Sequence, residues 1–254
     1  MIEDKNKHDP NRRKFIGASA VAGLTLAPGV SLLSIAKAKP LDEAVTSEKR
    51  WGLLIDTNKC ASGCTACVDA CNQENGLNRG DEKEARPEQK AQWIRKVDLR
   101  NKETGHEVSL PLMCQHCEHP PCVDVCPTGA SFKRADGIVL VDKHICIGCR
   151  YCMMACPYKA RSFIHEELLH QVEYAPRGKG TVESCTMCVQ RVDAKGQARD
   201  PACVEACNQE GHKAMFFGDL KDQDSEISIQ LKNFSSSAIR EDLQLNPGVR
   251  YRGI

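Results

Sequence analysis

Residues 146–157 read Cys-Ile-Gly-Cys-Arg-Tyr-Cys-Met-Met-Ala-Cys-Pro, and this stretch decides the fold class. Four cysteines stand here with gaps of two, two and three residues, and a proline follows the last of them. The short gaps keep the first three thiols on one tight loop. A gap of three residues places the fourth thiol about one helical turn later, on the far side. The first three thiols therefore converge on one centre, and the fourth points toward another.

Three further groups of four cysteines follow a similar plan, so the 16 cysteines of the chain form four quartets. We number the quartets in chain order. They are Cys60, Cys64, Cys67 and Cys71; Cys114, Cys117, Cys122 and Cys126; Cys146, Cys149, Cys152 and Cys156; and Cys185, Cys188, Cys203 and Cys207. The quartets account for every thiol in the sequence.

The composition leaves room in the interior for something other than apolar side chains. Only 5% of the 254 residues are aromatic, and the mean hydropathy is −0.44. A chain of this length normally folds around a sizeable apolar core. Cysteine chemistry must therefore supply part of the interior, as disulfides, zinc sites or iron–sulfur clusters.

The third quartet has the C-x2-C-x2-C-x3-C-P pattern used by bacterial ferredoxins with two clusters. In that pattern three cysteines bind one [4Fe–4S] cluster, and the fourth binds the neighbouring cluster. One quartet therefore needs a twin to complete its site. Four quartets make two twin pairs, so the sequence predicts four [4Fe–4S] clusters.

The residues after each quartet indicate which quartets are twins. The second and third quartets end in Cys-Pro, whereas the first and fourth end in Cys-Asn-Gln-Glu. We therefore expect an inner pair and an outer pair, each with crossed ligand sets. The expected sets are set I, Cys60, Cys64, Cys67 and Cys207; set II, Cys185, Cys188, Cys203 and Cys71; set III, Cys114, Cys117, Cys122 and Cys156; and set IV, Cys146, Cys149, Cys152 and Cys126.

Two other uses of the cysteines compete with iron–sulfur clusters. Zinc binds two C-x2-C pairs, and a third cysteine two residues further on has no use in such a site. Disulfides are typical of exported proteins, but cysteines two residues apart are poor partners. Either use would make the protein a structural scaffold stapled by zinc or disulfides. The gap from Cys60 to Cys64 departs most from the ferredoxin pattern.

Charge and reactive residues exclude further classes of function. The chain has 35 basic and 34 acidic residues, so it has no basic excess for binding nucleic acid. No nucleophile–base pair, phosphate-binding glycine loop or carboxylate dyad stands out in the sequence. We therefore expect no catalytic residue and no substrate site, which argues against a self-contained reductase.

Residues 1–38 are expected to be an export signal. An arginine pair at 12–13 precedes an apolar stretch, and Ala-Lys-Ala at 36–38 fits a signal cleavage site. The arginine pair resembles the twin-arginine signal, which serves proteins that are exported already folded. We expect a periplasmic protein. No later apolar run reaches the roughly 18 residues of a membrane span, so a partner would hold the protein at the inner membrane.

Residues 50–220 resemble the B-type iron–sulfur subunits found beside molybdopterin enzymes such as polysulfide and tetrathionate reductases. The motifs that carry this resemblance are Leu54 to Asp56, Cys114 to Pro121, Gly137 to Val139, Cys149 to Cys152, Cys156 to Tyr158 and Cys185 to Cys188. Within this family, the insertion between Cys60 and Cys64 and the run Gly211 to Ala214 are similar to the DsrO-type subunit. Subunits of that type are part of the transmembrane complex that accompanies dissimilatory sulfite reductase.

The resemblance implies an electron-transfer subunit of a respiratory complex in sulfur metabolism. It would relay single electrons through its clusters between a quinone-interacting integral membrane subunit and a periplasmic redox partner. For the DsrO-type match, that partner is a multihaem cytochrome. The alternative is the B-type component of a periplasmic molybdopterin oxidoreductase of the tetrathionate or polysulfide reductase type, with a molybdopterin catalytic subunit as partner.

The expected architecture is α+β, with two pseudo-symmetric modules that each resemble a bacterial ferredoxin with two clusters. The outer module takes residues 50–73 and 180–220, and the inner module takes residues 108–165. Residues 74–93 are an insertion. Residues 221–254 are a C-terminal helix and an extended tail that lies over a partner. Since the clusters supply the interior, we expect the apo chain to be largely unfolded.

Local patterns predict short elements around the quartets. Alternating apolar residues predict paired strands at 92–100 and 106–112. Ala-Asp-Gly at 135–137 predicts a hairpin between strands at 131–133 and 138–142. The remaining expected elements are strands at 51–56 and 213–220 and helices at 182–192 and 222–232.

Positive charges near the quartets are candidates for raising the reduction potentials of the clusters. Net charge, hydrogen bonds to sulfur and solvent exposure set those potentials. The candidates are Lys59, Arg150, Lys159, Arg161 and Arg191.

Overall fold

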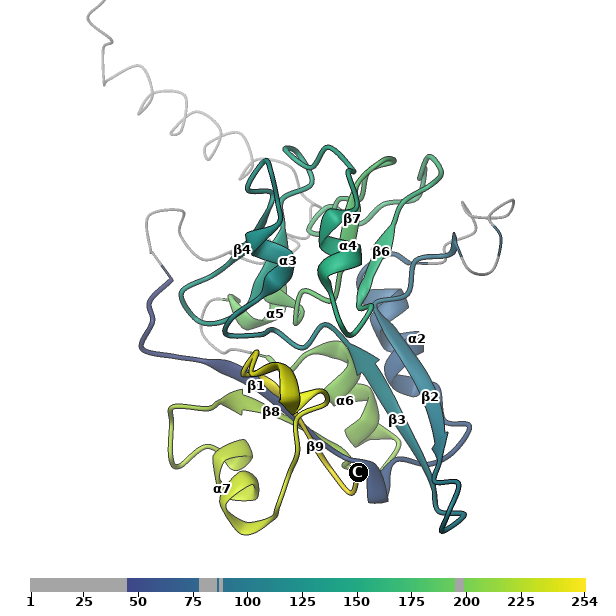
Figure 1. The fold of residues 1–254 in the computed structure, drawn as a ribbon, viewed down its shortest axis with the longest axis vertical. Helices are drawn as coiled ribbons and strands as arrows, with labels where there is room; N and C mark the ends of the chain where they lie inside the picture. Colours follow the sequence, from purple (N-terminus) through teal and green to yellow (C-terminus); the bar gives the residue numbers. More distant parts are fainter. Residues whose placement is uncertain (1–44, 78–85, 87–88, 195–198) are drawn as a thin grey trace, which may run out of the picture. The chain divides into compact units, whose positions relative to one another are not determined.

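The computed structural model describes residues 45–77, 86, 89–194 and 199–254, which form a mixed α+β fold (Figure 1). The expected export signal and most of residues 78–88 in the expected insertion lie outside the described residues. The strands are β1 (Trp51–Asp56), β2 (Ile94–Arg100), β3 (Glu107–Met113), β4 (Ser131–Lys133), β5 (Val139–Val141), β6 (Arg161–Phe163), β7 (Val182–Ser184), β8 (Met215–Asp219) and β9 (Val249–Arg252). The helices are α2 (Ala66–Glu74), α3 (Pro121–Asp124), α4 (Tyr151–Ala155), α5 (Val189–Val192), α6 (Ala202–Gln209) and α7 (Glu226–Asn233). Turns of 3-10 helix lie at Thr57–Lys59 and Glu241–Leu243.

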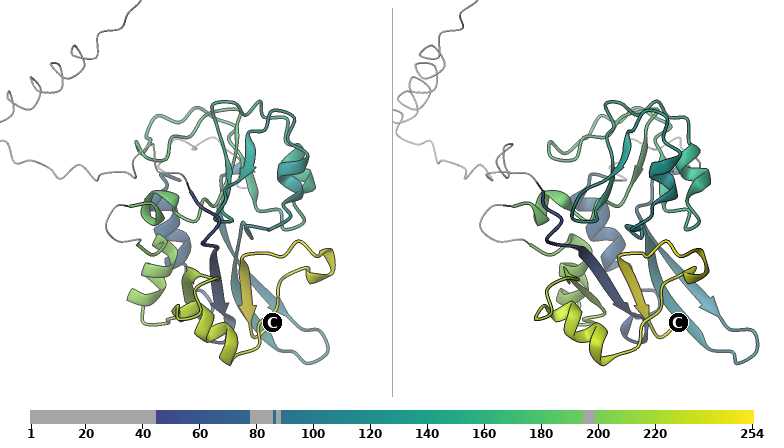
Figure 2. Two further views of the ribbon diagram at one scale, coloured as in Figure 1. Left: turned by 90° about the vertical axis from the view of Figure 1, so that its left-hand side faces the viewer. Right: turned by 60° about the vertical axis from the view of Figure 1, so that its left-hand side comes forward.

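β1 is the middle strand of a three-stranded sheet, antiparallel to β8 and parallel to β9. Leu53, Leu54 and Ile55 are all buried, as expected for a strand that is covered on both faces. α6 and α7 contact β8, and Figure 2 shows β1 and β9 side by side. The strands predicted at 51–56 and 213–220 are confirmed.

The other strands form two-stranded pairs. β2 and β3 pair in antiparallel register, with Ile94 opposite Met113, and β4 pairs with β5 across the turn that contains Gly137. Both pairings confirm the predicted hairpins. β6 pairs with β7, with Arg161 opposite Ser184. This last pairing places the residues after the third quartet beside those before the fourth.

Cysteine side chains make up a large part of the core. The main cluster of buried residues joins Leu53, Trp93 and Leu110 to cysteines from all four quartets. The interior therefore holds thiols where an ordinary domain of this size holds aliphatic and aromatic side chains.

The helix predicted at 182–192 is wrong. These residues form strand β7, a loop that carries Cys185 and Cys188, and the short helix α5. Met187 and Cys188 have φ angles of 57° and 49°, in the left-handed region. A right-handed helix cannot continue through two such residues, so the cysteine loop overrides the helical pattern.

The C-terminal tail contributes a strand to the central sheet, which the sequence did not predict. β9 joins the central sheet, and Val249 and Tyr251 are fully buried. Tyr251 Oη donates a hydrogen bond to the carbonyl oxygen of Pro111 at 3.0 Å. The helix predicted at 222–232 is confirmed as α7.

Among the residues that the structure describes, no helix has the length and apolar character needed to cross a bilayer.

Candidate metal centres

Four helices place the cysteines of the quartets in the same way. The third cysteine of each quartet is the second residue of a helix: Cys67 in α2, Cys122 in α3, Cys152 in α4 and Cys203 in α6. The fourth cysteine follows about one helical turn later. α2 contacts α6, and α3 contacts α4. Each helix pair therefore brings the last cysteine of one quartet toward the loop of its twin.

One cavity brings together thiols of the first and fourth quartets. It is lined by Cys60, Cys64 and Cys67 around α2, by Cys207 from α6 and by Lys96 from β2. Its empty volume is about 330 Å³. These four cysteines are the members of set I.

A second cavity lies between the second and third quartets. Cys146, Cys149 and Cys152 line it together with Cys126, and its empty volume is about 300 Å³. Cys149 is exposed to solvent, whereas Cys152 is buried. These four cysteines are the members of set IV.

The thiols of set III lie close enough to interact electrostatically. Burial, and then the charges of Cys114, Cys122 and Cys156, raise the pKa of Cys117 to about 12. Cys114 and Cys122 are buried as well. The structure therefore brings three thiols of the second quartet together with the last thiol of the third.

The thiols of set II form the other buried group. Burial, followed by the charges of Cys188, Cys185 and Cys71, raises the pKa of Cys203 well above its ordinary value. The same causes raise the pKa of Cys71, which interacts with Cys185 and Cys188. The last thiol of the first quartet thus lies with the thiols of the fourth quartet.

Groups of thiols with raised pKa values fit a cationic metal core. Burial disfavours each thiolate, and neighbouring thiolates repel one another. Iron binds the deprotonated thiolate and supplies the positive charge that offsets both penalties. Sets II and III are therefore suited to iron–sulfur cores.

The described side chains do not form the closely spaced group that a single zinc ion needs. A zinc ion with bonds of about 2.3 Å would hold its sulfur ligands within roughly 4 Å of one another. Within the described ranges, no three His, Cys, Asp or Glu side chains are grouped closely enough to hold a single ion. All 16 cysteines are unpaired thiols in this structure. A cubane core, with iron at four of its corners, spans wider separations between sulfur atoms.

Backbone amides donate hydrogen bonds to cysteine sulfur atoms, and four such bonds lie in sets I, II and IV. Such bonds stabilise negative charge on the sulfur and so influence the potential of a cluster. The bonds are Ala214 N to Cys207 Sγ at 3.4 Å, Met187 N to Cys185 Sγ at 3.4 Å, Ser131 N to Cys126 Sγ at 3.3 Å and Val182 N to Cys146 Sγ at 3.5 Å.

Left-handed residues let the chain turn tightly between cysteines. Gly63, His116, Gly148 and Met187 each lie between two cysteines of one quartet and have positive φ angles. Gly148 has a second constraint, because a Cβ atom there would collide with the carbonyl oxygen of Gly180. The loop of the third quartet therefore requires glycine at this position.

Comparison with known proteins agrees with this geometry. Two family models, each described as a 4Fe-4S dicluster domain, match residues 59–130 and 106–220. The Hdr-like menaquinol oxidoreductase iron-sulfur subunit 1 of Archaeoglobus fulgidus is 41% identical to the chain, over 95% of this chain and 97% of the relative. The protein belongs to the B-type family of ferredoxin-like iron–sulfur subunits.

Other relatives of this iron–sulfur subunit serve different respiratory enzymes. The B subunit of tetrathionate reductase from Salmonella typhimurium is 34% identical, over 97% of this chain and 89% of the relative. The B subunit of sulfite dehydrogenase from Allochromatium vinosum is 38% identical, over 78% of this chain and 81% of the relative. The predicted family is confirmed. The predicted function, an electron-transfer subunit of a respiratory oxidoreductase, is also confirmed. The predicted cofactors, four [4Fe–4S] clusters, are confirmed as well. Each such cluster accepts and donates one electron at a time.

Two positive side chains of the iron–sulfur subunit contact cysteine sulfur atoms. Arg161 Nη2 donates to Cys122 Sγ at 3.0 Å, and Lys96 Nζ donates to Cys60 Sγ at 2.9 Å. Arg161 is among the predicted candidates. Lys96 is not, because it lies on β2, far from every quartet along the chain, and no sequence pattern indicates which way the hairpin folds.

Three other predicted cations have different neighbours. Arg191 forms ion pairs with Glu74 and Glu205. Arg150 lies over the ring of Phe163, 3.8 Å from its centroid. Lys59 lies over the ring of Phe216 at 5.9 Å. Each of these charges contacts a carboxylate or an aromatic ring. The charge of Arg191 also opposes the raised pKa of Cys188 in set II.

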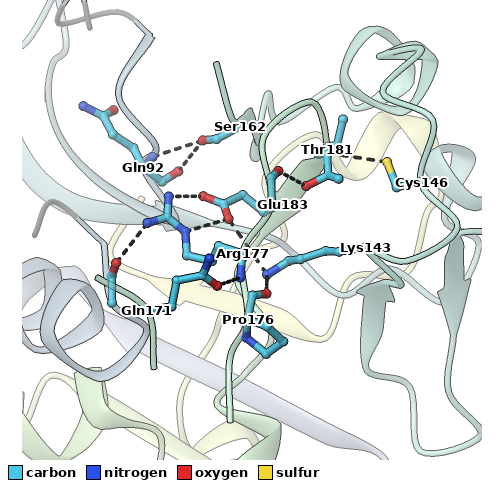
Figure 3. A network of polar contacts seen from close by, with 12 residues as sticks. Gln92, Lys143, Cys146, Ser162, Gln171, Pro176, Arg177, Thr181 and Glu183 are labelled. Carbon is cyan, nitrogen blue, oxygen red and sulfur yellow. Dashed lines mark hydrogen bonds and ion pairs between the residues drawn. The ribbon is translucent and has the colours of Figure 1, made fainter. Parts of the chain in front are cut away.

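A buried ion pair supports the loop that carries Cys146. Arg177 donates to both carboxylate oxygens of Glu183, at 2.9 and 2.8 Å, and to the carbonyl oxygen of Gly76 at 2.9 Å. Figure 3 shows Lys143 in the same network, with its ammonium 3.9 Å from Glu183. Glu183 lies on β7, whose neighbouring amide donates to Cys146 Sγ. The ion pair therefore fixes the strand that contacts set IV.

Proposed function

We propose that the protein conducts electrons along a row of four clusters held by sets I to IV in that order. Electrostatic interactions between cysteines of successive sets support this order. Cys203 of set II interacts with Cys67 of set I. Cys185 of set II interacts with Cys114 of set III, and Cys122 of set III interacts with Cys152 of set IV. This series of electrostatic interactions between successive sets carries the proposal.

Two pseudo-symmetric modules account for the row. In each module, two cysteine-bearing helices contact each other: α2 with α6 in the outer module and α3 with α4 in the inner one. The common placement of the third cysteine in all four helices supports an internal repeat. Each module would hold two clusters.

The end of the row at set IV suits an apolar partner. Four large apolar side chains that lie close to the exposed Cys149 in sequence face solvent, and we call them the apolar patch: Ile145, Ile147, Tyr151 and Met154, exposed by 48, 67, 54 and 73%. Large exposed apolar patches mark interaction sites. We assign the apolar patch to an integral membrane subunit that reacts with quinone, and the name of the archaeal relative, a menaquinol oxidoreductase subunit, supports quinol chemistry.

The end of the row at set I suits a soluble partner. A groove beside Cys60 is lined by polar and charged groups that include Asp98, Arg100, His106 and Glu107. Charged groups at a docking surface increase the rate and the specificity of association with a partner protein. The partner here would be a periplasmic multihaem cytochrome, as for a DsrO-type subunit, or a molybdopterin catalytic subunit. Relatives named for tetrathionate and sulfite enzymes support a place in sulfur metabolism for either choice.

The sequence of residues 1–38 supports export of the folded protein by the twin-arginine route and work in the periplasm, peripheral to the inner membrane. Substrate chemistry would belong to the partners, so that the protein has no substrate site of its own.

Purification from native membranes without air tests this function. We expect about 16 iron atoms per chain, four for each cluster, and several interacting [4Fe–4S] signals in low-temperature EPR spectra of the reduced protein. A membrane subunit should copurify, and quinol should reduce the clusters. A colourless native protein that contains only zinc, or only disulfides, would contradict the proposal.

Substitutions in the apolar patch test the assignment of its partner. Ile147→Asp and Met154→Asp should slow reduction by quinol in the reassembled complex at least tenfold, while dithionite still reduces all four clusters. Ile229→Asp on α7 is the matched control, because Ile229 is also exposed but lies far from the row of cysteines in sequence. Equal rates in all three variants would rule out the apolar patch as the docking site.

A further inference from the structure

Arg161 is a buried guanidinium among cysteine thiols. Its side chain begins at the first residue of β6, and the residue is only 6% exposed. Nη2 donates to Cys122 Sγ at 3.0 Å and to Ser131 Oγ at 2.8 Å. Burial of a charge is costly unless opposite charge lies nearby. The neighbours of Arg161 therefore indicate what the charge is for.

The charges around Arg161 are thiolates from two different ligand sets. Burial by itself lowers the pKa of Arg161, but the charges of Cys122, Cys114 and Cys152 outweigh burial and raise it. Cys122 and Cys114 belong to set III, whereas Cys152 belongs to set IV. Across the part of the chain that the structure describes, no ion pair joins Arg161 to a carboxylate. The guanidinium therefore lies between the two inner sets.

One nitrogen of Arg161 lacks a partner. Nη1 is buried and has no hydrogen-bond acceptor among the described residues. Buried donors are rarely left unsatisfied, because the loss costs about 1–3 kcal/mol or more for a charged group. A cluster held by set III or set IV would present sulfur acceptors to this donor. The buried, unpartnered N–H of Arg161 therefore fits the presence of an inner cluster beside it.

We propose that Arg161 is a positive charge shared by sets III and IV, and that it raises the reduction potential of both inner clusters. Reduction adds one electron to a cluster, and the nearby positive charge makes that addition more favourable. No proton moves, because the guanidinium stays charged throughout. This inference rests on the proposed ligand sets. It adds to them a residue whose charge raises the reduction potentials of two neighbouring clusters together.

Lys96 provides a natural comparison. Its ammonium contacts Cys60 Sγ at 2.9 Å and the carbonyl oxygen of Ala61 at 3.1 Å, both at set I. Lys96 therefore acts on one cluster at the end of the row, whereas Arg161 acts on two clusters at once. The two residues differ in the number of potentials that they control.

A redox titration followed by EPR tests the inference on the full chain with its clusters. In Arg161→Met, two of the four reduction steps should shift to lower potential, each with at least a tenfold loss in the reduction equilibrium, or about 59 mV for one electron. Arg161→Lys should restore most of both shifts, because it keeps the charge. Lys96→Met should shift one other step, and the double variant should shift three, since distant sites act additively.

The outcomes separate this inference from the proposed function. Unchanged potentials in Arg161→Met, or a shift in a single step, would overturn the shared charge while leaving the clusters in place. A wild-type protein without four [4Fe–4S] signals would overturn the proposed function itself. If Arg161→Met loses iron, Arg161→Gln is titrated instead. Glutamine keeps a hydrogen-bond donor to Cys122 but removes the positive charge. The same two shifts are then expected.

Discussion

The last cysteine of the second quartet lies with thiols of the third quartet. Cys126 follows Cys122 by about one helical turn, yet it lines a cavity with Cys146, Cys149 and Cys152. Cys122 lies instead with the thiols of set III. Under the proposed ligand sets, α3 and the turn that follows it would hold one ligand of each inner cluster, Cys122 and Cys126.

Serine variants test the crossed ligand sets. Cys126→Ser should alter the same EPR signal as Cys149→Ser, because both remove a ligand of set IV. Cys156→Ser should alter the signal that Cys117→Ser alters, although Cys156 belongs to the quartet of Cys149. Iron analysis and EPR spectra of the reduced variants provide the measurement. If Cys126→Ser instead matched Cys117→Ser, the crossed sets would be incorrect.

Gly148 permits a turn that other residues cannot make. We expect Gly148→Ala to lose the cluster of set IV, since its φ is 69° and the added methyl group would collide with the carbonyl oxygen of Gly180. Iron content should fall by about four atoms per chain, one cluster. Gly105→Ala is the control, because Gly105 also has a positive φ but has open space around it. Equal iron in both variants would show that the loop adapts.

At the scale of elements, strand β9 fastens the end of the chain to the sheet. Tyr251 packs in the core and receives a hydrogen bond from Gln115 Nε2 at 3.1 Å, while its own hydroxyl donates to Pro111. Gln115 lies between Cys114 and Cys117 in sequence. The C-terminal strand therefore buttresses the loop of the second quartet.

Tyr251→Ala should lower the free energy of unfolding by about 3–5 kcal/mol, as removal of a large buried aromatic side chain does. Ile254→Ala, at a half-exposed position of the same terminus, should change it by less than about 0.5 kcal/mol. The urea concentration at which the cluster absorbance is lost measures the difference. Similar midpoints for both variants would mean that β9 contributes little to stability.

The Arg177–Glu183 pair is the second element-scale support. Arg177→Met leaves the fully buried Glu183 carboxylate without its bidentate partner, which typically costs about 3–5 kcal/mol. We expect faster release of iron to a chelator, beginning with the cluster next to β7. Arg100→Met is the control, because its ion pair with Glu107 is largely exposed. Unchanged kinetics of iron release in Arg177→Met would contradict this role.

At the scale of the whole molecule, we expect the fold to depend on the clusters. Thiols of all four quartets belong to the buried core. We expect iron to bind these buried thiols as thiolates and so to stabilise the core. Anaerobic removal of iron by a chelator should abolish most of the far-UV circular dichroism, and reconstitution with iron and sulfide should restore it. A metal-free chain that kept its native spectrum would show that the polypeptide folds alone.

Elements set by local spacing were predictable, and those set by distant contacts were not. The hairpin of β4 and β5 follows from its turn residues, and β1 follows from its apolar run. The helix expected at 182–192 failed because cysteine geometry forces Met187 and Cys188 into left-handed conformations. The pairing of residues 249–252 with β1 was not predicted, because nothing near them in sequence indicates that β1 has a free parallel edge.

The sequence by itself determined the number and kind of cofactors, because gaps of two and three residues decide locally which thiols converge. Only the tertiary structure decided which charges lie beside those thiols. Lys96 and Arg161 reach sulfur atoms of residues 36 and 39 positions away, and Cys185 reaches Cys114 across an even longer separation. Electrostatic effects depend on distance through space, and only the folded chain defines that distance.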